Sequence, residues 1–477
     1  MMWKWIGSVL CLLIIVTASA PPLGAAENTI DEIAATPAQK RLVKILTGRS
    51  DSARTQLLAH LQAHPQQLDA HLHVIIAAAE DLLADHAGEV AAAEALPDDP
   101  GAEGSEEPLP VPATVSQVLR LLARSPREEA RAVITQSLDH VDTHVAMVAM
   151  DVIGEFQIEL AIDDLVMQIK RPAFDAQYAY RFALVRALAR LHCPRSIEWL
   201  QRLEEQLDGQ LHHEIQDRLA NVDLQDFDGD PEQLLRYRQQ LDDDAMMGPA
   251  RLNANPNHPV STRTRAEPQT KPASAVTSSR PGGLQLQDAP SESQGKLRLS
   301  NGHYYGIELN AGRMLFIIDR SGSMRRPAYH ETRLQSAKRE LVRVIENLAP
   351  QAEFAIMLFD TQVYVWRDEL LLATEENKDI AIEFVKRISW GDRTNTHGVL
   401  RESLRFNDQL EAVFMLTDGR PTEGAILMPQ AIIQDIVERN RMRHLQINTI
   451  GIGVNPVTTH FLQTLAEETG GEFRRVD

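Results

Sequence analysis

The apolar residues between positions 36 and 240 recur at intervals of three and four, which is the spacing of amphipathic helices. The pattern begins with Leu42, Ile45, Leu46, Leu57, Leu61, Leu72, Val74 and Ile75. It is interrupted by an acidic segment rich in Pro and Gly, which is typical of a flexible connector. We therefore predict a helical region at 27–95, a linker at 96–114 and a second helical region at 115–242.

The second helical region contains a repeat with a period of 35 residues. The matching apolar positions are Ala149 and Leu184, Ile153 and Leu188, Phe156 and Leu191, Ile162 and Ile197, and Leu165 and Leu200. Each copy predicts a helix, a turn and a second helix, and a degenerate copy precedes them at 118–138. Periods in the thirties are typical of helical hairpins that stack as a solenoid, because one hairpin cannot bury its apolar face alone. The pattern resembles HEAT-like repeats; the alternative is two unrelated helices whose core spacing coincides.

Residues 243–302 contain seven prolines and no aromatic residue. Such a segment cannot bury enough apolar area to offset the entropy that ordering would cost. We predict a disordered linker here, which would let the parts on either side of it move independently.

From Arg313 onward, short apolar runs alternate with helical patterns. The predicted strands are Met314–Ile318, Phe354–Phe359, Val363–Trp366, Ala412–Thr417, Gln446–Ile452 and Glu472–Val476. The predicted helices are Leu334–Leu348, Glu375–Ser389, His397–Phe406, Pro429–Arg443 and Thr459–Thr469. This alternation is typical of an α/β fold, in which helices cover both faces of a doubly wound, mostly parallel sheet. The sequence thus predicts an α/β domain at 303–477, preceded by an all-α region.

Polar side chains gather at three segments that lie at one edge of this predicted sheet. They are Asp319-Arg-Ser321-Gly-Ser323 after the first strand, Gly391-Asp-Arg-Thr394-Asn-Thr396 before a helix, and Thr417-Asp418-Gly419 at the end of a later strand. In doubly wound sheets ligands bind beyond the carboxyl ends of the strands, where the connections change sides. Each motif alone is weak, because Asp and Ser at such turns are ordinary helix caps. The three in this order are specific.

Together these motifs resemble the von Willebrand factor A domain. The closing segment 450–476, IGIGVNPVTTHFLQTLAEETGGEFRRV, is similar to the last strand, helix and strand of that family. The resemblance covers residues 311–477, a little over a third of the chain. It implies the doubly wound fold and a metal-dependent binding site.

The resemblance also assigns the ligands of this site: Asp319, Ser321, Ser323, Thr394 and Asp418. Its three hydroxyls would bind the ion, and its two carboxylates would lie nearby, often acting through water. Magnesium prefers six oxygen ligands in octahedral geometry, so we expect Mg²⁺, with Mn²⁺ or Ca²⁺ as alternatives. Neutral hydroxyls leave the ion electrophilic with one position open, which an acidic side chain of a partner protein can fill. The family's behaviour further implies that affinity depends on a shift of the last helix.

Two features of the middle loop limit how far the family's ligand assignment applies to this chain. Asp392 and Arg393 stand where many family members have small residues, so a nearby charge pair would alter which ligands fit. Thr396 is an alternative to Thr394 as the hydroxyl ligand, although Thr394 matches the family position.

The chain carries a net charge of −19, and residues 27–244 hold 39 acidic against 19 basic side chains. An acidic half without a basic stripe excludes a nucleic-acid partner, since nothing there would neutralise phosphates. The acidic run Asp226–Asp230 does not fit a calcium loop, because Gly and Glu are missing from the required positions. We interpret it as a turn in which Asp230 caps a helix that begins at Pro231.

The N-terminus has the pattern of an export signal, with Lys4, the apolar stretch Ile6–Ala20 and small residues at 24–26. We predict a signal peptide at 1–26 and a periplasmic or extracellular location. An uncleaved signal is the alternative, and it would be the protein's one route to a membrane. Without the signal only Cys193 remains, which excludes an internal disulfide.

Two classes of function follow. The first is an exported, metal-dependent binding protein whose helical repeats offer a second docking surface. The second is a metal-dependent hydrolase or phosphotransferase that uses the same ion as a Lewis acid, with Glu423 as its candidate base. A scaffold that has lost its metal is a third reading, and the intact ligand set argues against it.

Overall fold

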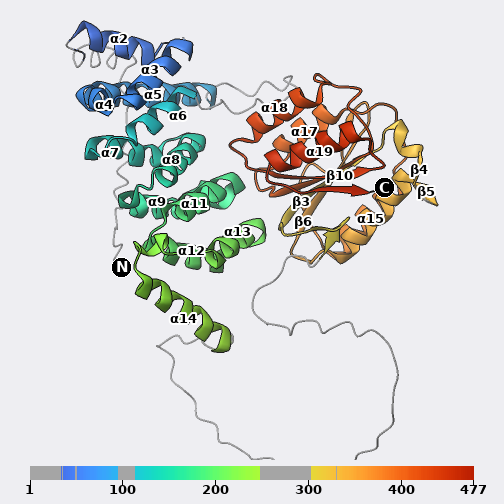
Figure 1. Ribbon diagram of the computed structural model, residues 1–477. Helices are drawn as coiled ribbons and strands as arrows, with labels where there is room; N and C mark the ends of the chain where they lie inside the picture. Colours follow the sequence, from blue (N-terminus) through green and yellow to red (C-terminus); the bar gives the residue numbers. More distant parts are fainter. Residues whose placement is uncertain are drawn as a thin grey trace, which may run out of the picture.

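The computed structural model describes residues 34, 36–48, 51–94, 113–247, 302–328 and 330–476. These residues form a stack of helices and, beside it, an α/β domain (Figure 1). The predicted signal peptide at 1–26 lies outside the described residues, as do most of the predicted linkers at 96–114 and 243–302. Within the described parts of the chain, no helix combines the length and the apolar character needed to cross a membrane.

The helical domain contains both of the helical regions that the sequence predicts. Its first helices are α2 (Pro37–Leu46), α3 (Asp51–Ala63), α4 (Pro65–Ala70) and α5 (Leu72–Glu94). The next are α6 (Ala113–Leu122), α7 (Glu128–Gln136), α8 (Thr143–Glu155), α9 (Ile162–Met167) and α10 (Pro172–Ala176). The last are α11 (Tyr178–Leu191), α12 (Pro194–Gln206), α13 (Gly209–Ala220) and α14 (Pro231–Met247). The structure thus extends α6 and α14 by a few residues into the predicted linkers.

One hydrophobic core runs through the whole helical stack, from Leu42 in α2 to Tyr237 in α14. Polar contacts also join its two halves. The Nε2 atom of buried His86 in α5 lies 2.7 Å from the carboxylate of Asp142, which caps α8. The two helical regions therefore pack as one body across the predicted linker at 96–114.

The predicted 35-residue repeat corresponds to two stacked helical hairpins, α8 with α9 and α11 with α12. Nine of the ten matching apolar residues are buried, and Phe156 is half-buried. The backbone conformation repeats with the same period. Gln157 and His192, which are 35 residues apart, both have a positive φ, of 51° and 47°. Each of these residues lies in the turn that ends the first helix of its hairpin. The predicted likeness to HEAT repeats stays a prediction.

The α/β domain is built on a seven-stranded sheet in the order β11-β10-β9-β3-β6-β7, with β8 also paired to β6. The strands are β3 (Arg313–Asp319), β6 (Glu353–Phe359), β7 (Val363–Val365), β8 (Leu371–Leu372), β9 (Ala412–Thr417), β10 (Gln446–Ile452) and β11 (Phe473–Val476). Five of them are parallel, and β7 and β8 run antiparallel to β6. The predicted doubly wound, mostly parallel sheet is confirmed.

Helices cover both faces of this sheet, as the continuous apolar strands predict. One face packs against α15 (Arg333–Asn347) and α16 (Glu375–Arg387), and the other against α17 (Thr396–Arg405), α18 (Pro429–Asn440) and α19 (Pro456–Glu468) (Figure 1). Successive residues of β3 alternate between the two cores, because Phe316 belongs to the first and Leu315 and Ile317 to the second.

The structure differs from the predicted elements in small ways. The helix expected to reach Arg443 ends at Asn440, and residues 441–444 form a turn in which His444 has a φ of 50°. Two short hairpins were not predicted. They are β1 (His303–Tyr304) with β2 (Ile307–Glu308), and β4 (Pro327–Ala328) with β5 (Glu331–Thr332). Strands of two residues carry too little periodicity to be recognised in a sequence.

The helical stack contacts the edge of the α/β domain that lies opposite the carboxyl ends of the strands. Glu411 directly precedes β9, and its buried carboxylate accepts hydrogen bonds from the backbone N–H groups of Gly312 (2.8 Å) and Gln210 (3.0 Å). The Arg181 guanidinium of α11 donates to the side chain of Gln409 at 2.6 Å. These bonds join the two domains, because Gln210 and Arg181 belong to the helical stack.

The acidic run at 226–230 is a turn, as predicted. Asp230 caps α14, since its carboxylate accepts a 2.8 Å hydrogen bond from the N–H of Glu232. Asp226 is fully buried and accepts a hydrogen bond from Arg218.

Candidate metal site

The candidate site lies where the sheet's connections change direction. The chain runs from β3 to β6 on one side of β3 and later returns to β9 on its other side. The carboxyl ends of β3 and β9 therefore flank a crevice, which is the usual ligand position in such sheets. Asp319 ends β3, and Asp418 directly follows β9.

Side chains from these two strand ends form one hydrogen-bonded network. The fully buried carboxylate of Asp319 accepts bonds from Thr417 Oγ1 (2.5 Å) and from the N–H of Ser321 (2.7 Å). The hydroxyl oxygens of Ser321 and Ser323 lie 3.0 Å apart. Ser323 Oγ in turn donates to Asp418 Oδ1 at 2.6 Å. Four of the five predicted ligands are therefore within hydrogen-bond reach of a neighbour in the set.

The fifth predicted ligand, Thr394, faces the same point from the middle loop. A methyl group built on Gly419 would lie 3.5 Å from Ser323 Oγ and 3.7 Å from Thr394 Oγ1. The two hydroxyls thus point at the space beside Gly419. The hydroxyl of Thr396 is not within 4 Å of that point, although it is buried and has no hydrogen-bond partner among the described residues. This geometry favours Thr394 over Thr396.

Backbone bonds hold the middle loop against the turn that follows β3. The N–H of Gly322 donates to the carbonyl of Asp392 at 2.7 Å, and the N–H of Gly391 donates to the carbonyl of Arg320 at 2.5 Å. Gly391 is required here, because a Cβ at this position would lie 1.8 Å from the carboxylate of Asp360. The position of Thr394 therefore depends on this close approach.

Asp360 and Arg320 support the site, and the sequence interpretation missed both. Asp360 follows β6 and pairs with Arg320, whose Nε lies 3.1 Å from its carboxylate. The carbonyl of Asp360 accepts the N–H of Asn395 at 2.8 Å, which anchors the middle loop. Asp360 carries the same signal as Asp319, an acid directly after a buried strand.

The two carboxylates of the site repel each other. Burial, and next the charge of Asp418, raise the pKa of Asp319 to about 7, although hydrogen bonds from Thr417 and Ser321 act in the opposite direction. Asp418 has a cationic partner, because Arg333 Nη1 lies 2.6 Å from its Oδ2. A buried pair of acids with one cation is short of positive charge, which a divalent ion would supply.

The residues present fit a hard divalent cation. Carboxylate and hydroxyl oxygens are the donors that Mg²⁺, Mn²⁺ and Ca²⁺ prefer, and these five come from three separate segments that converge. No soft sulfur or imidazole ligand stands among them. When bound, such an ion would offer a coordination position to an incoming oxygen ligand.

Asp392 and Arg393 were expected to act as a charge pair in the middle loop, but Arg393 pairs with another residue. Arg393 pairs with Glu423, at 2.8 Å, across the mouth of the site. Glu423 is the residue that the enzymatic alternative requires as a base. Its carboxylate is engaged by the Arg393 guanidinium.

Sequence comparison gives the same family as the geometry. The strand order and the helices on both faces define an α/β domain of the doubly wound class. Residues 312–474 match the family model described as the von Willebrand factor type A domain, and this part of the chain is such a domain.

The relatives share this domain with the chain. Inter-alpha-trypsin inhibitor heavy chain H1 of Homo sapiens is 31% identical over 175 residues, which are 34% of this chain and 18% of that protein. The human von Willebrand factor A domain-containing protein 3B is 30% identical over 159 residues, 33% of this chain and 11% of that protein. The chain thus spans less than a quarter of these two relatives.

Solved structures include a protein that is similar to this part of the chain. A von Willebrand factor type A protein from Catenulispora acidiphila is 23% identical, with a TM-score of 0.31. The match covers 35% of this chain and 38% of that one.

Proposed function

We propose that this protein is a metal-dependent protein-binding molecule whose A-type domain binds a carboxylate of a partner protein through a divalent cation. Asp319, Ser321, Ser323, Thr394 and Asp418 hold the ion, which is Mg²⁺ or, as alternatives, Mn²⁺ or Ca²⁺. The observation that carries the proposal is the convergence of these five oxygen donors at the crevice between β3 and β9. The open coordination position then selects an oxygen anion from the partner.

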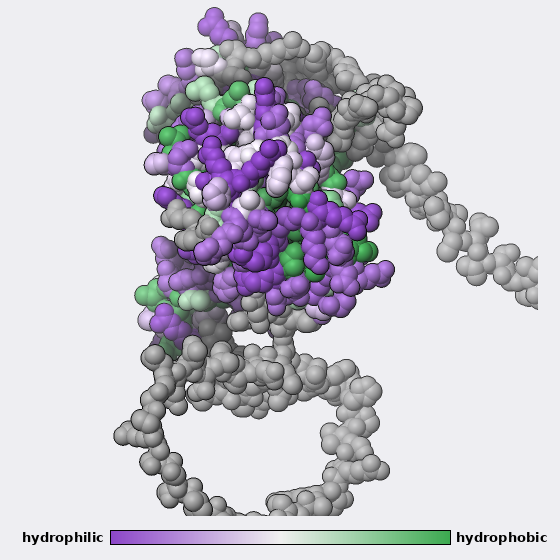
Figure 2. All heavy atoms as spheres, turned by 90° about the vertical axis from the view of Figure 1, so that its right-hand side faces the viewer, coloured by the Kyte–Doolittle hydropathy of each residue, from purple (hydrophilic) through white to green (hydrophobic). Residues whose placement is uncertain are grey.

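The surface around the crevice supports an acidic partner. Arg325 lies over the ring of Trp390, with its guanidinium carbon 5.1 Å from the ring centroid, and Arg320 lies over Tyr364 at the same distance. Trp390 and Tyr364 are 47% and 39% exposed, unusually high for aromatic side chains. Exposed aromatics with arginines are typical of binding surfaces, and the arginines attract acidic side chains. The side of the molecule that carries β4 and β5 is mostly hydrophilic (Figure 2).

The enzymatic alternative has less support. A hydrolase or phosphotransferase needs a free base beside the ion, and Glu423 is paired with Arg393 instead. We therefore propose a binding function and not turnover.

Export and a second docking surface complete the proposal. The N-terminal pattern at 1–26 supports a signal peptide, and relatives of the heavy-chain type share the A domain. The helical stack presents an extended surface, which solenoid-like arrays use to contact partners.

Titration of metal into the full chain tests this function. After metal removal on a chelating resin, MgCl₂ and MnCl₂ are titrated into the wild type, into Asp319→Ala and into Asp379→Ala, an exposed acid of α16 that serves as the control. Binding at one site that Asp319→Ala removes and Asp379→Ala keeps is the expected result. The same binding in Asp319→Ala would overturn the assigned site.

The second arm measures the partner chemistry. A labelled peptide with one glutamate, and its glutamine counterpart, are tested by fluorescence anisotropy with and without Mg²⁺. We expect Mg²⁺-dependent binding of the glutamate peptide alone. Equal binding of both peptides, or binding that ignores metal, would contradict the role of the open position.

A further inference from the structure

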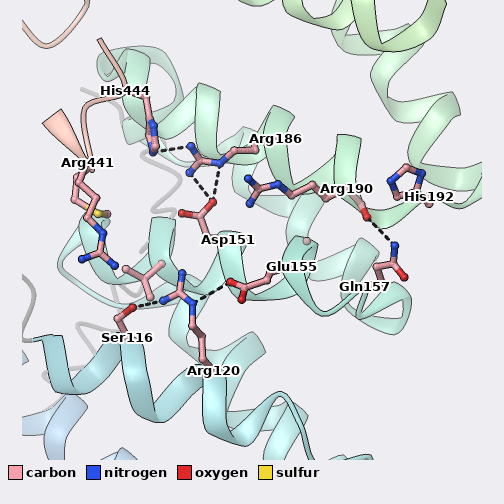
Figure 3. Close-up of a pocket in the computed structure, with 13 residues that line it drawn as sticks. Ser116, Arg120, Asp151, Glu155, Gln157, Arg186, Arg190, His192, Arg441 and His444 are labelled. Atoms are coloured by element: carbon pink, nitrogen blue, oxygen red, sulfur yellow. Dashed lines mark hydrogen bonds and ion pairs between the residues drawn. The ribbon is translucent and has the colours of Figure 1, made fainter. Parts of the chain in front are cut away.

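A pocket of about 560 Å³ lies at the contact between the helical stack and the α/β domain, far from the metal site in the fold. Helices α6, α8 and α11 form one side of it, and residues 441–444 after α18 form the other. Figure 3 shows Arg120, Arg186 and Arg190 reaching into it from the helices, with Arg441 and His444 approaching from the α/β domain. The volume is in the range of small-molecule sites.

The helical side of the pocket is built from equivalent positions of the 35-residue repeat. Ser116, Asp151 and Arg186 occupy one such position in three successive hairpins, and Arg120, Glu155 and Arg190 occupy another. Stacking places equivalent residues beside each other. The pocket is therefore a property of the stacked array and extends the repeat to the degenerate copy at 118–138.

We call each of these two sets of equivalent positions a column. The charged side chains in the two columns form ion pairs, with the exception of Arg190. Arg186 Nε donates to Asp151 Oδ1 at 2.8 Å, and Arg120 Nε donates to Glu155 Oε2 at 2.9 Å. Arg190 is the last charged residue of its column, because the residue 35 positions further along the chain is the uncharged Gln225. Among the described residues its guanidinium has no hydrogen bond or ion pair. The positive charge of Arg190 is therefore not balanced by an acid of its column.

Arg441 adds a second positive charge that is weakly compensated. Its ion pair with Glu438, at 3.9 Å, joins side chains that are 57% and 77% exposed. Four arginines and two acids line the pocket, which leaves an excess of two positive charges. The surrounding half of the chain, 27–244, has 20 more acidic than basic residues, so this excess is local.

His444 reports how positive the pocket is. Arg186 Nη1 lies 2.6 Å from its Nε2, so the neutral ring accepts a hydrogen bond from the guanidinium. Burial, and then the charges of Arg186, Arg190 and Arg441, lower the pKa of His444 to about 3. His444 is therefore neutral at pH 7, and the positive charge of the pocket comes from the arginines.

From this geometry we infer a second binding site: the pocket binds a small molecule with two or more negative charges, a phosphate compound or a polycarboxylate, between Arg190 of the helical stack and Arg441 of the α/β domain. The planar guanidinium matches both kinds of anion through paired N–H donors. A ligand held by both arginines bridges the two domains. This site is independent of the proposed metal site.

The test is calorimetric titration of inorganic pyrophosphate and of citrate into the full chain. Metal is removed on a chelating resin and not with EDTA, because EDTA is itself a polyanion and both probes bind metal ions. The variants are Arg190→Gln and Arg441→Gln, two exposed side chains whose replacement leaves the cores intact. Arg238→Gln, an exposed arginine of α14 outside the pocket, is the matched control.

We expect one bound anion per chain, with an affinity that falls about tenfold or more in each pocket variant and stays unchanged in Arg238→Gln. Asp319→Ala should bind the anion as the wild type does, which separates this site from the metal site. The ratio of the two affinities assigns the ligand class as phosphate or carboxylate. Absence of binding by either probe at millimolar concentration, or equal binding by all variants, would overturn the proposal.

Discussion

Ser323 Oγ lies 2.6 Å from Asp418 Oδ1, although 95 residues separate the two in the chain. The bond joins the ends of β3 and β9, which are neighbours in the sheet because the chain reverses its winding direction between them. The relative position of the two side chains is therefore set by the ladder between two buried strands. Sites supported in this way keep their geometry when a loop residue changes.

The two candidate hydroxyls of the middle loop give the first prediction. We expect Thr394→Ala to weaken Mg²⁺ binding about tenfold or more, because its Oγ1 faces the same space as Ser323 Oγ. Thr396→Ala should leave Mg²⁺ affinity within about twofold, since its hydroxyl is not within 4 Å of the space beside Gly419. Calorimetry on both variants measures this. The reverse ranking would assign the ligand to Thr396.

The buried acid at the domain contact gives the second prediction. Glu411→Ala removes the acceptor of two backbone N–H groups and the partner of Arg313, whose Nη1 lies 2.9 Å from the carboxylate. Loss of one partner of a buried pair costs about 3 kcal/mol. We expect faster hydrogen exchange at Gln210 and Gly312, from opening of the domain contact.

An ion pair within the α/β domain, between the exposed acid Asp408 and the half-buried Arg443, is the control for Glu411. Asp408 lies 2.9 Å from Arg443, and its side chain is 67% exposed. Exposed pairs contribute about 0–1 kcal/mol, so Asp408→Ala should leave exchange nearly unchanged. Equal effects of the two substitutions on hydrogen exchange would show that the buried Glu411 stabilises the domain contact no more than Asp408 does.

The third prediction concerns pH. The pKa of His444 is about 3 in the folded protein, below its ordinary value of 6.5, so its contribution to stability is present above pH 6.5 and is lost as the pH falls toward 3. Between pH 7 and pH 5 the loss is about 2 kcal/mol. His444→Gln keeps an acceptor for Arg186 and cannot titrate. The stability difference between wild type and variant, from urea unfolding, should therefore shrink over this range, and a constant difference would refute the assignment.

Two helical glycines give the fourth prediction, because the same substitution should have opposite effects. A Cβ on Gly154 of α8 would lie 2.9 Å from the Cα of Ala187 in α11, so Gly154→Ala forces the helices apart at a cost of about 1–3 kcal/mol. A Cβ on Gly88 of α5 meets nothing within 4 Å, and Gly88→Ala should stabilise by about 0.5–1 kcal/mol. Urea midpoints of both variants check the signs.

Most of the α/β domain was predictable because its information is local. The strand from Met314 to Ile318 is apolar throughout, and the motif that follows it places polar side chains at a turn. The parts that were missed depend on tertiary contacts. Arg333 opens α15 and reaches Asp418, 85 residues away, and no periodicity in the sequence marks that pairing. Asp360 could have been found, since it follows a buried strand as Asp319 does.

The helical half shows a similar division. The spacing of Ile153 and Leu188 gave the period of the hairpins, which depends on each helix alone. The contact of α11 with residues 441–444 depends on how two domains meet, and the bond between Arg186 and His444 spans 258 residues. The pocket that results from this contact could not be inferred from either half.

Arg333 also touches a third element, because its Nη2 donates to the carbonyl of Gly453 at 3.0 Å while its Nη1 holds Asp418. Gly453 directly follows β10 and begins the turn that leads into α19. An ion that competes with Arg333 for Asp418 therefore changes the free energy of the segment before α19. Suppose that a ligand binds to this segment. By thermodynamic linkage, it must change the affinity of the site for the ion by the same factor by which the ion changes the affinity of the segment for that ligand. Arg333 thus links the segment before α19 directly to Asp418 of the proposed metal site.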